Sequence, residues 1–125
     1  MSNSIMDRVA EAKAVVPSIT PDEVSSLAGR DDVVIVDVRD DNEVAATGKV
    51  KGAIHVSRGM LEFRADETTP LHNEAFTKEK TIIVYCGSGG RAALSGKALL
   101  DLGYKDVRNL GAFQDWVDAG GAVDQ

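Results

Sequence analysis

The residue with the clearest chemical potential in this chain is its single cysteine, Cys86. It follows the apolar run 81–85 and precedes the segment Gly87-Ser88-Gly89-Gly90-Arg91. Glycines after a strand allow positive φ angles, so that several backbone N–H groups can point at one atom. The positive end of a following helix and the guanidinium of Arg91 would add to this field. The sequence therefore predicts a reactive thiolate in an anion-binding loop.

A purely structural role for Cys86 is the alternative hypothesis, because a lone cysteine often serves as a small buried hydrophobic side chain. One cysteine cannot form an internal disulfide, and with His55 and His72 it leaves too few ligands for a familiar metal site. We therefore expect no metal site, and we expect both histidines to be bystanders. The glycine loop and Arg91 favour the reactive thiol over the structural one.

Two unbroken apolar runs predict the strands that must position this loop. Residues 33–36 and 81–85 are typical of strands buried on both faces of a parallel sheet, and 107–110 predicts a shorter strand. Ligands of such sheets bind at the carboxyl ends of the strands, which is where Cys86 falls. Helical patterns alternate with these strands, at 4–16, 20–28, 40–47, 60–65, 91–102 and from 113 to a stop at Gly120-Gly121.

One helix has a clear division into two faces. In 91–102, Leu94, Ala98 and Leu102 form a stripe that is expected to pack on the sheet, while Lys97 and Asp101 are spaced to form an ion pair facing water. The alternation of strands and helices predicts an α/β fold.

Composition limits the domain count and the classes of partner. The chain has 125 residues, which suits one domain, and we assign 1–16 to an N-terminal helical arm and 17–125 to a single domain. A net charge of −6 argues against binding to nucleic acid or to anionic membranes. No apolar stretch has the length of a membrane helix, and no signal peptide is evident. We expect a cytoplasmic monomer, with the arm packed on its own domain or on a neighbour.

Several separated segments resemble the single-domain rhodanese family of sulfurtransferases. They are Val36-Asp37-Val38-Arg39 with Glu43, then Gly48, Gly52-Ala53-Ile54, 85–92 and 103–116. The resemblance covers about 19–123. It implies a rhodanese-like α/β fold, with a central, mostly parallel five-stranded sheet and helices on both faces, and it implies no cofactor.

The resemblance also implies a two-step sulfur transfer. The Cys86 thiolate would take a sulfane sulfur from an anionic donor such as thiosulfate and hold it as a persulfide. Cyanide, a thiol or a sulfur-accepting protein would then remove it. The residues expected to bind the substrate are those of the loop, Gly87, Ser88, Gly89, Gly90 and Arg91, through their backbone N–H groups. A non-catalytic sulfur carrier, sensor or partner-docking module is the alternative.

Four further residues receive assignments. Asp37 and Arg39 resemble the family's Asp-x-Arg element, which implies an ion pair that orders the edge of the pocket. Glu43 lies four positions after Arg39 and is expected to pair with it. Arg58 could meet the anionic group of the donor, or it could simply pair with Glu62.

Loop length separates sulfur transfer from phosphoryl chemistry. Four residues lie between Cys86 and Arg91, one fewer than is typical of cysteine phosphatases and related arsenate reductases. A tetrahedral phosphate needs the larger ring of donors, whereas a single terminal sulfur fits the smaller one. The sequence therefore favours a sulfurtransferase over a phosphatase or an arsenate reductase.

Overall fold

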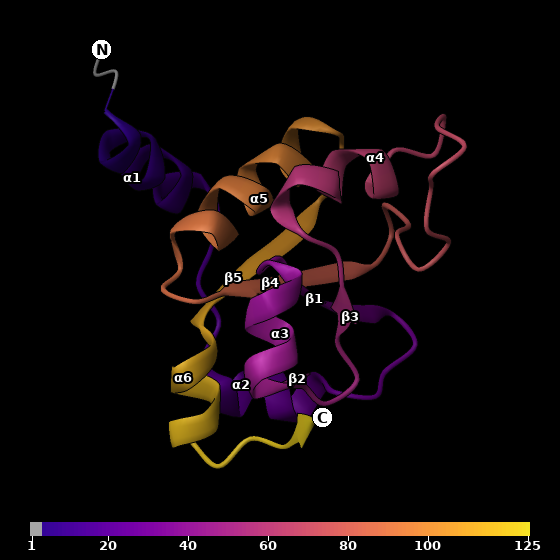
Figure 1. Cartoon of the computed structure of the whole chain (residues 1–125). Coiled ribbons are helices and arrows are strands. Elements are labelled where there is room, and N and C mark those ends of the chain that lie inside the picture. Colours follow the sequence, from indigo (N-terminus) through magenta and orange to yellow (C-terminus); the bar gives the residue numbers. More distant parts are fainter. Residues whose placement is uncertain (1–3) are drawn as a thin grey trace.

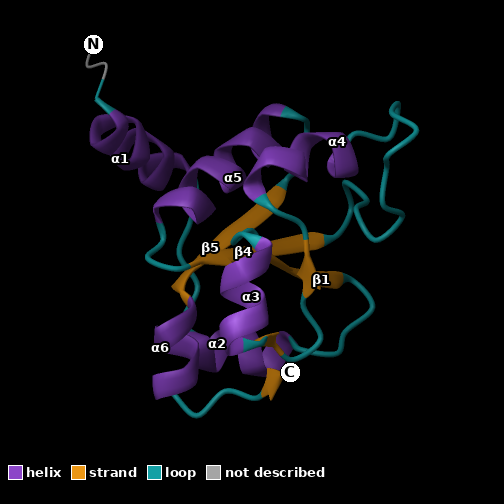
Figure 2. Ribbon diagram, in the orientation of Figure 1, coloured by secondary structure: helices purple, strands orange, loops and turns teal. Residues whose placement is uncertain are grey.

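A parallel sheet lies between two groups of helices in the computed structural model, which describes residues 4–125 (Figures 1 and 2). Its strands follow the order β3-β1-β4-β5, and every neighbouring pair is parallel. The sheet has four strands, not the five that the family resemblance implied, and a single parallel bridge between Ser18 and Asn109 lies beyond β5. The strands are β1 (Val33–Asp37), β3 (Ile54–His55), β4 (Thr81–Cys86) and β5 (Asp106–Ala112).

The helices begin and end close to the positions that the sequence predicts. A capping box between Thr20 and Glu23 starts α2, and Gly48 with a φ of 77° ends α3. Two short strands, β2 (Lys49–Val50) and β6 (Val123–Asp124), form a separate antiparallel pair that the sequence did not predict. The helices are α1 (Ile5–Val15), α2 (Pro21–Leu27), α3 (Asp41–Thr47), the 3₁₀ turn η1 (Arg58–Met60), α4 (Leu61–Ala65), α5 (Gly90–Asp101) and α6 (Phe113–Asp118).

The two faces of the sheet carry separate hydrophobic cores. In Figure 1, α4 and α5 cover one face, and α2, α3 and α6 lie on the other side. Side chains of β4 alternate between the faces, as expected for a strand: Cys86 belongs to the core under α5, and Tyr85 to the core that contains Trp116. The α/β fold with helices on both faces is therefore confirmed.

The buried face of α5 differs in part from the predicted stripe. Ser95, Gly96 and Leu99 are buried, and Leu102 packs against the sheet-side core as expected. Leu94 instead packs against α1, and Ala98 lines a surface pocket. The prediction was wrong for these two residues because α1 covers a second side of α5. The expected pair of Lys97 with Asp101 is present, at 3.1 Å.

The N-terminal helix packs on its own domain. Val9 and Ala12 of α1 are buried against Ala93 of α5. At Gly96 a Cβ atom would lie only 2.8 Å from Cγ1 of Val16, so the missing side chain permits close approach of this segment. Residues 1–3 of the predicted arm lie outside the described residues. Among the helices of 4–125, none is both long and apolar enough to cross a membrane.

A buried ionic network lies at the carboxyl end of β1. Asp37 is fully buried and Arg39 is 3% exposed, and Nη2 of Arg39 lies 2.7 Å from Oδ2 of Asp37. Arg39 also donates to Oγ1 of Thr47 and to the carbonyl of Gly48, while the Tyr85 hydroxyl donates to Asp37 at 2.6 Å. Every charged atom of the pair therefore has a partner, as burial demands.

This network generates a prediction for stability. Asp37→Asn removes the negative charge with little change of volume and leaves the Arg39 guanidinium buried without a counter-charge. We expect it to lower the free energy of unfolding by about 3 to 5 kcal/mol, measured by urea denaturation.

The matched control is Asp32→Asn. Asp32 pairs with Arg30 at 3.0 Å, but both side chains are more than half exposed, so this change should leave stability nearly unaltered. Equal losses in the two variants would show that burial does not strengthen the dependence of Arg39 on Asp37.

Candidate active site

The Cys86 thiol lies at the carboxyl end of β4 and has no exposed surface. Its Sγ atom accepts two backbone hydrogen bonds, from Gly89 N–H at 3.0 Å and from Ala92 N–H at 3.3 Å. The predicted convergence of loop N–H groups on this sulfur is therefore confirmed for Gly89. Such donors stabilise a thiolate more than a thiol.

Local conformation explains why these two N–H groups are available. Gly89 is the residue before α5 and adopts a φ of 100°, which favours glycine. Gly90 begins the helix, one residue earlier than predicted. Ala92 therefore lies in the first turn, where backbone N–H groups have no partner within the helix. Sequence reasoning missed Ala92, although its place in that turn was the signal that could have found it.

Arg91 binds a carboxylate from the opposite side of the site. Its Nη1 and Nη2 atoms lie 2.6 and 3.0 Å from the two carboxylate oxygens of Glu43 in α3. The expected pair of Glu43 with Arg39 was wrong, because Arg39 turns into the core to meet Asp37. The hydrogen bonds from Arg91 lower the pKa of Glu43 to about 2 and raise the pKa of Arg91.

The Glu43–Arg91 pair rests against the loop that holds Cys86. A Cβ atom at Gly87 would lie 3.0 Å from Nη2 of Arg91 and 3.5 Å from Oε2 of Glu43. Gly87 therefore leaves the space that the two side chains occupy. The hydrogen bonds to Glu43 are the main cause that raises the pKa of Arg91, and Cys86 is a lesser one. Glu43 thus neutralises part of the positive charge that the sequence analysis assigned to the loop.

Asp37 and Arg39 form the predicted ion pair, and it lies beneath the site rather than in its wall. The guanidinium carbon of Arg39 lies 4.3 Å from the ring centre of Phe113 and 5.8 Å from that of Tyr85. Both rings belong to the core on the face opposite α5. His55, an expected bystander, bonds through Nε2 to the carbonyl of Arg39 at 2.7 Å. The support that this pair gives to the pocket stays a prediction.

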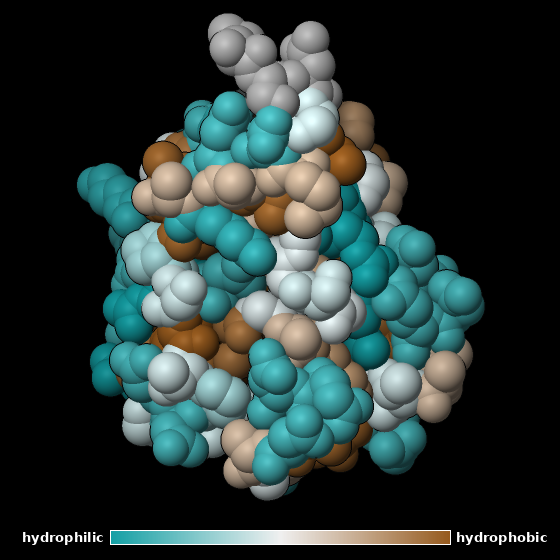
Figure 3. Space-filling model, turned by 90° about the vertical axis from the view of Figure 1, so that its left-hand side faces the viewer, coloured by the Kyte–Doolittle hydropathy of each residue, from teal (hydrophilic) through white to brown (hydrophobic). Residues whose placement is uncertain are grey.

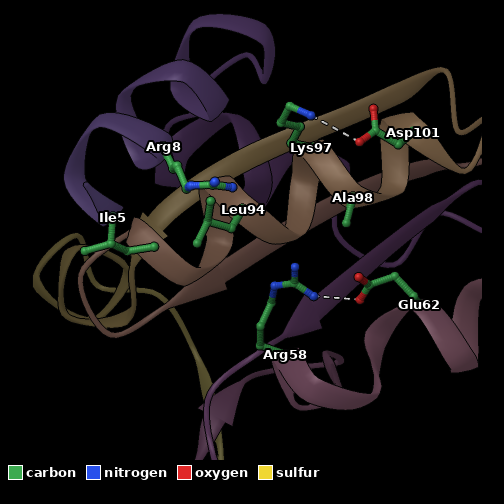
Figure 4. A pocket seen from close by; sticks show the side chains of 8 residues that line it. All are labelled: Ile5, Arg8, Arg58, Glu62, Leu94, Lys97, Ala98 and Asp101. Carbon is green, nitrogen blue, oxygen red and sulfur yellow. Dashed lines mark hydrogen bonds and ion pairs between the residues drawn. The ribbon is translucent and has the colours of Figure 1, made fainter. Parts of the chain in front are cut away.

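Arg58 makes the simpler of its two expected contacts. Its Nη1 atom lies 2.6 Å from Oε1 of Glu62. Figure 4 shows Arg58 in a pocket between α1, α5 and α4, opposite Leu94 and Ala98. None of the residues that line this pocket belongs to the loop 86–91. A contact between Arg58 and a sulfur donor therefore stays a prediction.

A second pocket, of about 230 Å³, adjoins the Cys86 loop directly. The loop lies at the left of Figure 1, so Figure 3 looks onto this face, where hydrophobic atoms reach the surface in small separate groups. Sequence reasoning did not find this pocket because its walls come from three distant segments, 13–19, 88–89 and 109–115. The lining residues are Lys13, Ser18, Ile19, Ser88, Gly89, Asn109, Leu110, Gly111, Ala112 and Asp115.

Comparison with known proteins identifies the family. The family model described as the rhodanese-like domain matches residues 20–119. The chain belongs to the rhodanese-like family. The matched residues include Cys86, Arg91 and the Asp37–Arg39 pair, whereas α1 lies before the match. The resemblance that the sequence motifs indicated is thus confirmed.

Relatives of this rhodanese-like domain carry names for different activities. Thiosulfate sulfurtransferase GlpE of Coxiella burnetii is 30% identical over 95 residues, which make up 75% of this chain and 80% of that protein. The tRNA uridine(34) hydroxylase of Acinetobacter baumannii is 36% identical over 93 residues, 74% of this chain but 28% of the hydroxylase. A solved structure from Rhodopseudomonas palustris is described as a protein of unknown function and possible tyrosine phosphatase. It is 34% identical, with a TM-score of 0.89, and the match covers 99% of this chain and 96% of that one.

The ion pair of Glu43 with Arg91 predicts a pH dependence. The pKa of Glu43 is lowered from 4.5 to about 2, so the pair stabilises the folded state fully above the unfolded pKa. That contribution is lost as pH falls through the folded pKa. We expect the stability difference between the wild type and Glu43→Gln to be constant near neutral pH and to shrink between 4.5 and about 2.

Chemical denaturation at a series of pH values measures this difference. Glu43→Gln cannot lose a proton, so it removes the titration while keeping the size of the side chain. A difference that stayed constant through this acid range would contradict the assigned pairing.

Proposed function

We propose that this protein is a sulfurtransferase that moves a sulfane sulfur from an anionic donor such as thiosulfate to a thiol or cyanide. The observation that carries the proposal is the pair of N–H groups, from Gly89 and Ala92, directed at Sγ of Cys86. They can stabilise the negative charge of the Cys86 thiolate, which attacks the donor in the first step and is restored in the second. The sulfurtransferase name of a relative that matches most of the chain adds support.

The chemistry needs no residue beyond those around the loop. The Cys86 thiolate attacks the outer sulfur of thiosulfate, and a new S–S bond forms. The bond between the two donor sulfurs breaks, and its electron pair leaves with sulfite. In the second step the acceptor attacks the outer sulfur of the persulfide, and the electron pair of the broken bond returns to Sγ. With one cysteine in the chain, the acceptor must be external.

Arg91 is placed to bind the donor once it exchanges partners. Cys86 has no exposed surface, so a donor reaches Sγ only when neighbouring side chains shift. The Glu43 carboxylate already binds the Arg91 guanidinium through two oxygens, which is the geometry that a sulfonate group would adopt. A donor that displaces Glu43 from Arg91 would therefore gain access to the loop, and the Arg91 guanidinium would orient it.

Phosphatase activity is the second candidate, because the similar Rhodopseudomonas palustris structure is described as a possible tyrosine phosphatase. The four residues between Cys86 and Arg91 argue against it, since the loop is one residue shorter than the phosphatase loop. The two N–H groups point at Sγ itself, whereas a tetrahedral phosphate needs a larger ring of donors for its oxygens.

Intact mass spectrometry tests the proposal directly. After incubation with thiosulfate, we expect the mass to rise by one sulfur atom, and cyanide to restore the original mass. Cys86→Ser should show no gain. A wild-type protein that gains no sulfur from thiosulfate, polysulfide or a persulfide donor would overturn the proposal, and release of phosphate from p-nitrophenyl phosphate would favour the phosphatase.

A glycine substitution tests the role of the N–H groups. Gly89→Ala places a side chain at a φ of 100° without a steric clash, since its nearest neighbour would be Cα of Gly111 at 3.6 Å. The strain should move the Gly89 N–H away from Sγ and lower sulfur transfer to cyanide at least about tenfold.

Gly120→Ala is the matched control for this strain. Gly120 has a φ of 85° and open space around its Cα, and it lies beyond α6, outside the loop. Both variants should lose similar stability, measured by thermal unfolding, but only Gly89→Ala should lose activity. Equal turnover in the two variants would show that the Gly89 N–H has no part in the reaction.

A further inference from the structure

A pocket of about 380 Å³ lies on the outer side of α5, between α1 and the segment from η1 to α4 (Figure 4). We call it the outer pocket. Leu94, Ala98 and Asp101 of α5 line its floor. Spacings of four and three residues place them on one face of the helix, over two turns or about 10 Å. The first turn of α1 forms one side of the pocket, and η1 with α4 forms the other.

Apolar side chains beside the outer pocket are left uncovered. Ile5 is 58% exposed and Met6 is 69% exposed, although Val9 and Ala12 of the same helix are buried against α5. Exposed apolar surface next to a hollow marks a place where another molecule binds. Ile5 lines the pocket and Met6 does not, so the apolar surface continues beyond the pocket. This continuation favours an occupant larger than a small ligand.

Two arginines face the floor of the outer pocket from opposite sides. Figure 4 shows the guanidinium groups of Arg8 and Arg58 on either side of Leu94 and Ala98. Among the arginines of residues 4–125, Arg8 is the one whose side chain has neither a carboxylate nor a carbonyl partner. An arginine guanidinium has the geometry to bind a carboxylate through two hydrogen bonds. Arg8 is therefore available to an acidic group of another molecule.

The other charges of the outer pocket balance one another. Arg58 pairs with Glu62, and Lys97 pairs with Asp101, each four residues along a helical segment and with partly exposed side chains. Arg8 thus leaves an excess of one positive charge on a protein whose net charge is −6. Charge complementarity across an interface selects the partner. It favours an acidic partner here, while the two carboxylates in the walls disfavour the dense negative charge of nucleic acid or lipid head groups.

We propose that the outer pocket is a docking site for an acidic amphipathic helix of a partner protein. Apolar side chains four residues apart on that helix pack on Leu94, Ala98 and Ile5, and carboxylates on its flanks bind Arg8 and Arg58. The two turns of α5 that form the floor match this spacing. No residue of the outer pocket belongs to the loop 86–91, so the inference does not rest on the proposed sulfur transfer.

The helix α1 adds this surface to the common domain. The match to the rhodanese-like domain begins at residue 20, so Ile5 and Arg8 lie before it. The similar structure from Rhodopseudomonas palustris matches 99% of this chain, and α1 falls within that match. The helix that forms one side of the outer pocket thus has a counterpart in that protein, although the family model does not include it.

Binding of a synthetic peptide to the full chain tests the proposal. The probe is a capped helical peptide of about 15 residues, with two leucines four positions apart and glutamates on both flanks. Two matched peptides carry glutamine or lysine in place of glutamate. The acidic peptide should shift the amide NMR signals of Leu94 and Ala98. The glutamine and lysine peptides should bind at least about tenfold more weakly.

Charge reversal at Arg8 is the decisive variant. Arg8→Glu should weaken binding of the acidic peptide at least about tenfold, and it should bind the lysine peptide better than the wild type does. Ala98→Glu should abolish binding of the acidic peptide, because it fills the floor with a negative side chain. Arg30→Glu is the matched control: it changes the net charge equally at an exposed arginine outside the pocket, and it should bind the acidic peptide as the wild type does.

The remaining outcomes separate this proposal from its alternatives. A wild type that binds none of the peptides at millimolar concentration, or equal losses in Arg8→Glu and Arg30→Glu, would overturn the docking site. Hexanoate shifts as large as those of the peptide would assign the pocket to a small carboxylate instead. A dimer in sedimentation velocity that Ala98→Glu abolishes would assign it to a second copy of the chain. If the peptide binds as predicted but thiosulfate adds no sulfur, the docking site stands and only the sulfurtransferase is overturned.

Discussion

The fully buried charge of Asp37 constrains the rest of the structure. A carboxylate without solvent demands a cation and hydrogen bonds, and Arg39 and Tyr85 supply them. Tyr85 in turn accepts from the N–H of Val50 at 2.9 Å, which ties the small second sheet to the main one. Burial and the hydrogen bond to Asp37 raise the pKa of Tyr85, so it stays a neutral donor. Cys86 follows Tyr85 in the same strand, so this network also fixes the position of Cys86.

Neighbouring residues of β4 face opposite sides of the sheet and have different roles. Tyr85 points into the ionic network on one side of the sheet, and Cys86 points toward the first turn of α5 on the other. A rigid strand end allows the loop to turn sharply at Gly89 and to aim its N–H at Sγ. Glu43 then balances the charge of Arg91 beside Gly87. The site is thus closed and electrostatically balanced at rest, and an anionic substrate would compete with a carboxylate for the same guanidinium.

Local pattern predicted the central strands and the loop N–H group that points at Cys86. These features depend on short-range effects. The apolar runs before Asp37 and Cys86 determine the two strands, and the glycines after Cys86 determine the shape of the loop and the direction of its N–H groups. The pairing of Glu43 could not be predicted in this way. The spacing of four residues favoured a pair of Glu43 with Arg39, but Arg39 pairs with the buried Asp37. Glu43 of α3 instead lies close enough to the loop to pair with Arg91.

Other features depend on how distant segments meet, and sequence spacing does not encode that. Leu94 packs on α1 because Gly96 permits close approach of the chain at Val16. Lys13 and Asp115 are more than 100 residues apart along the chain, and only the folded chain brings them to one pocket. The strands β2 and β6 contain two residues each, too few for an alternating pattern to be read.

The central claim is that the backbone N–H groups of Gly89 and Ala92 stabilise the Sγ thiolate with which Cys86 takes up and releases a sulfur atom, and one measurement tests it directly. Amide NMR signals of the two residues are followed while thiosulfate is added and then cyanide. The account predicts that both signals move when the protein gains sulfur and return when cyanide removes it. A protein that gains the sulfur while both signals stay in place would contradict it.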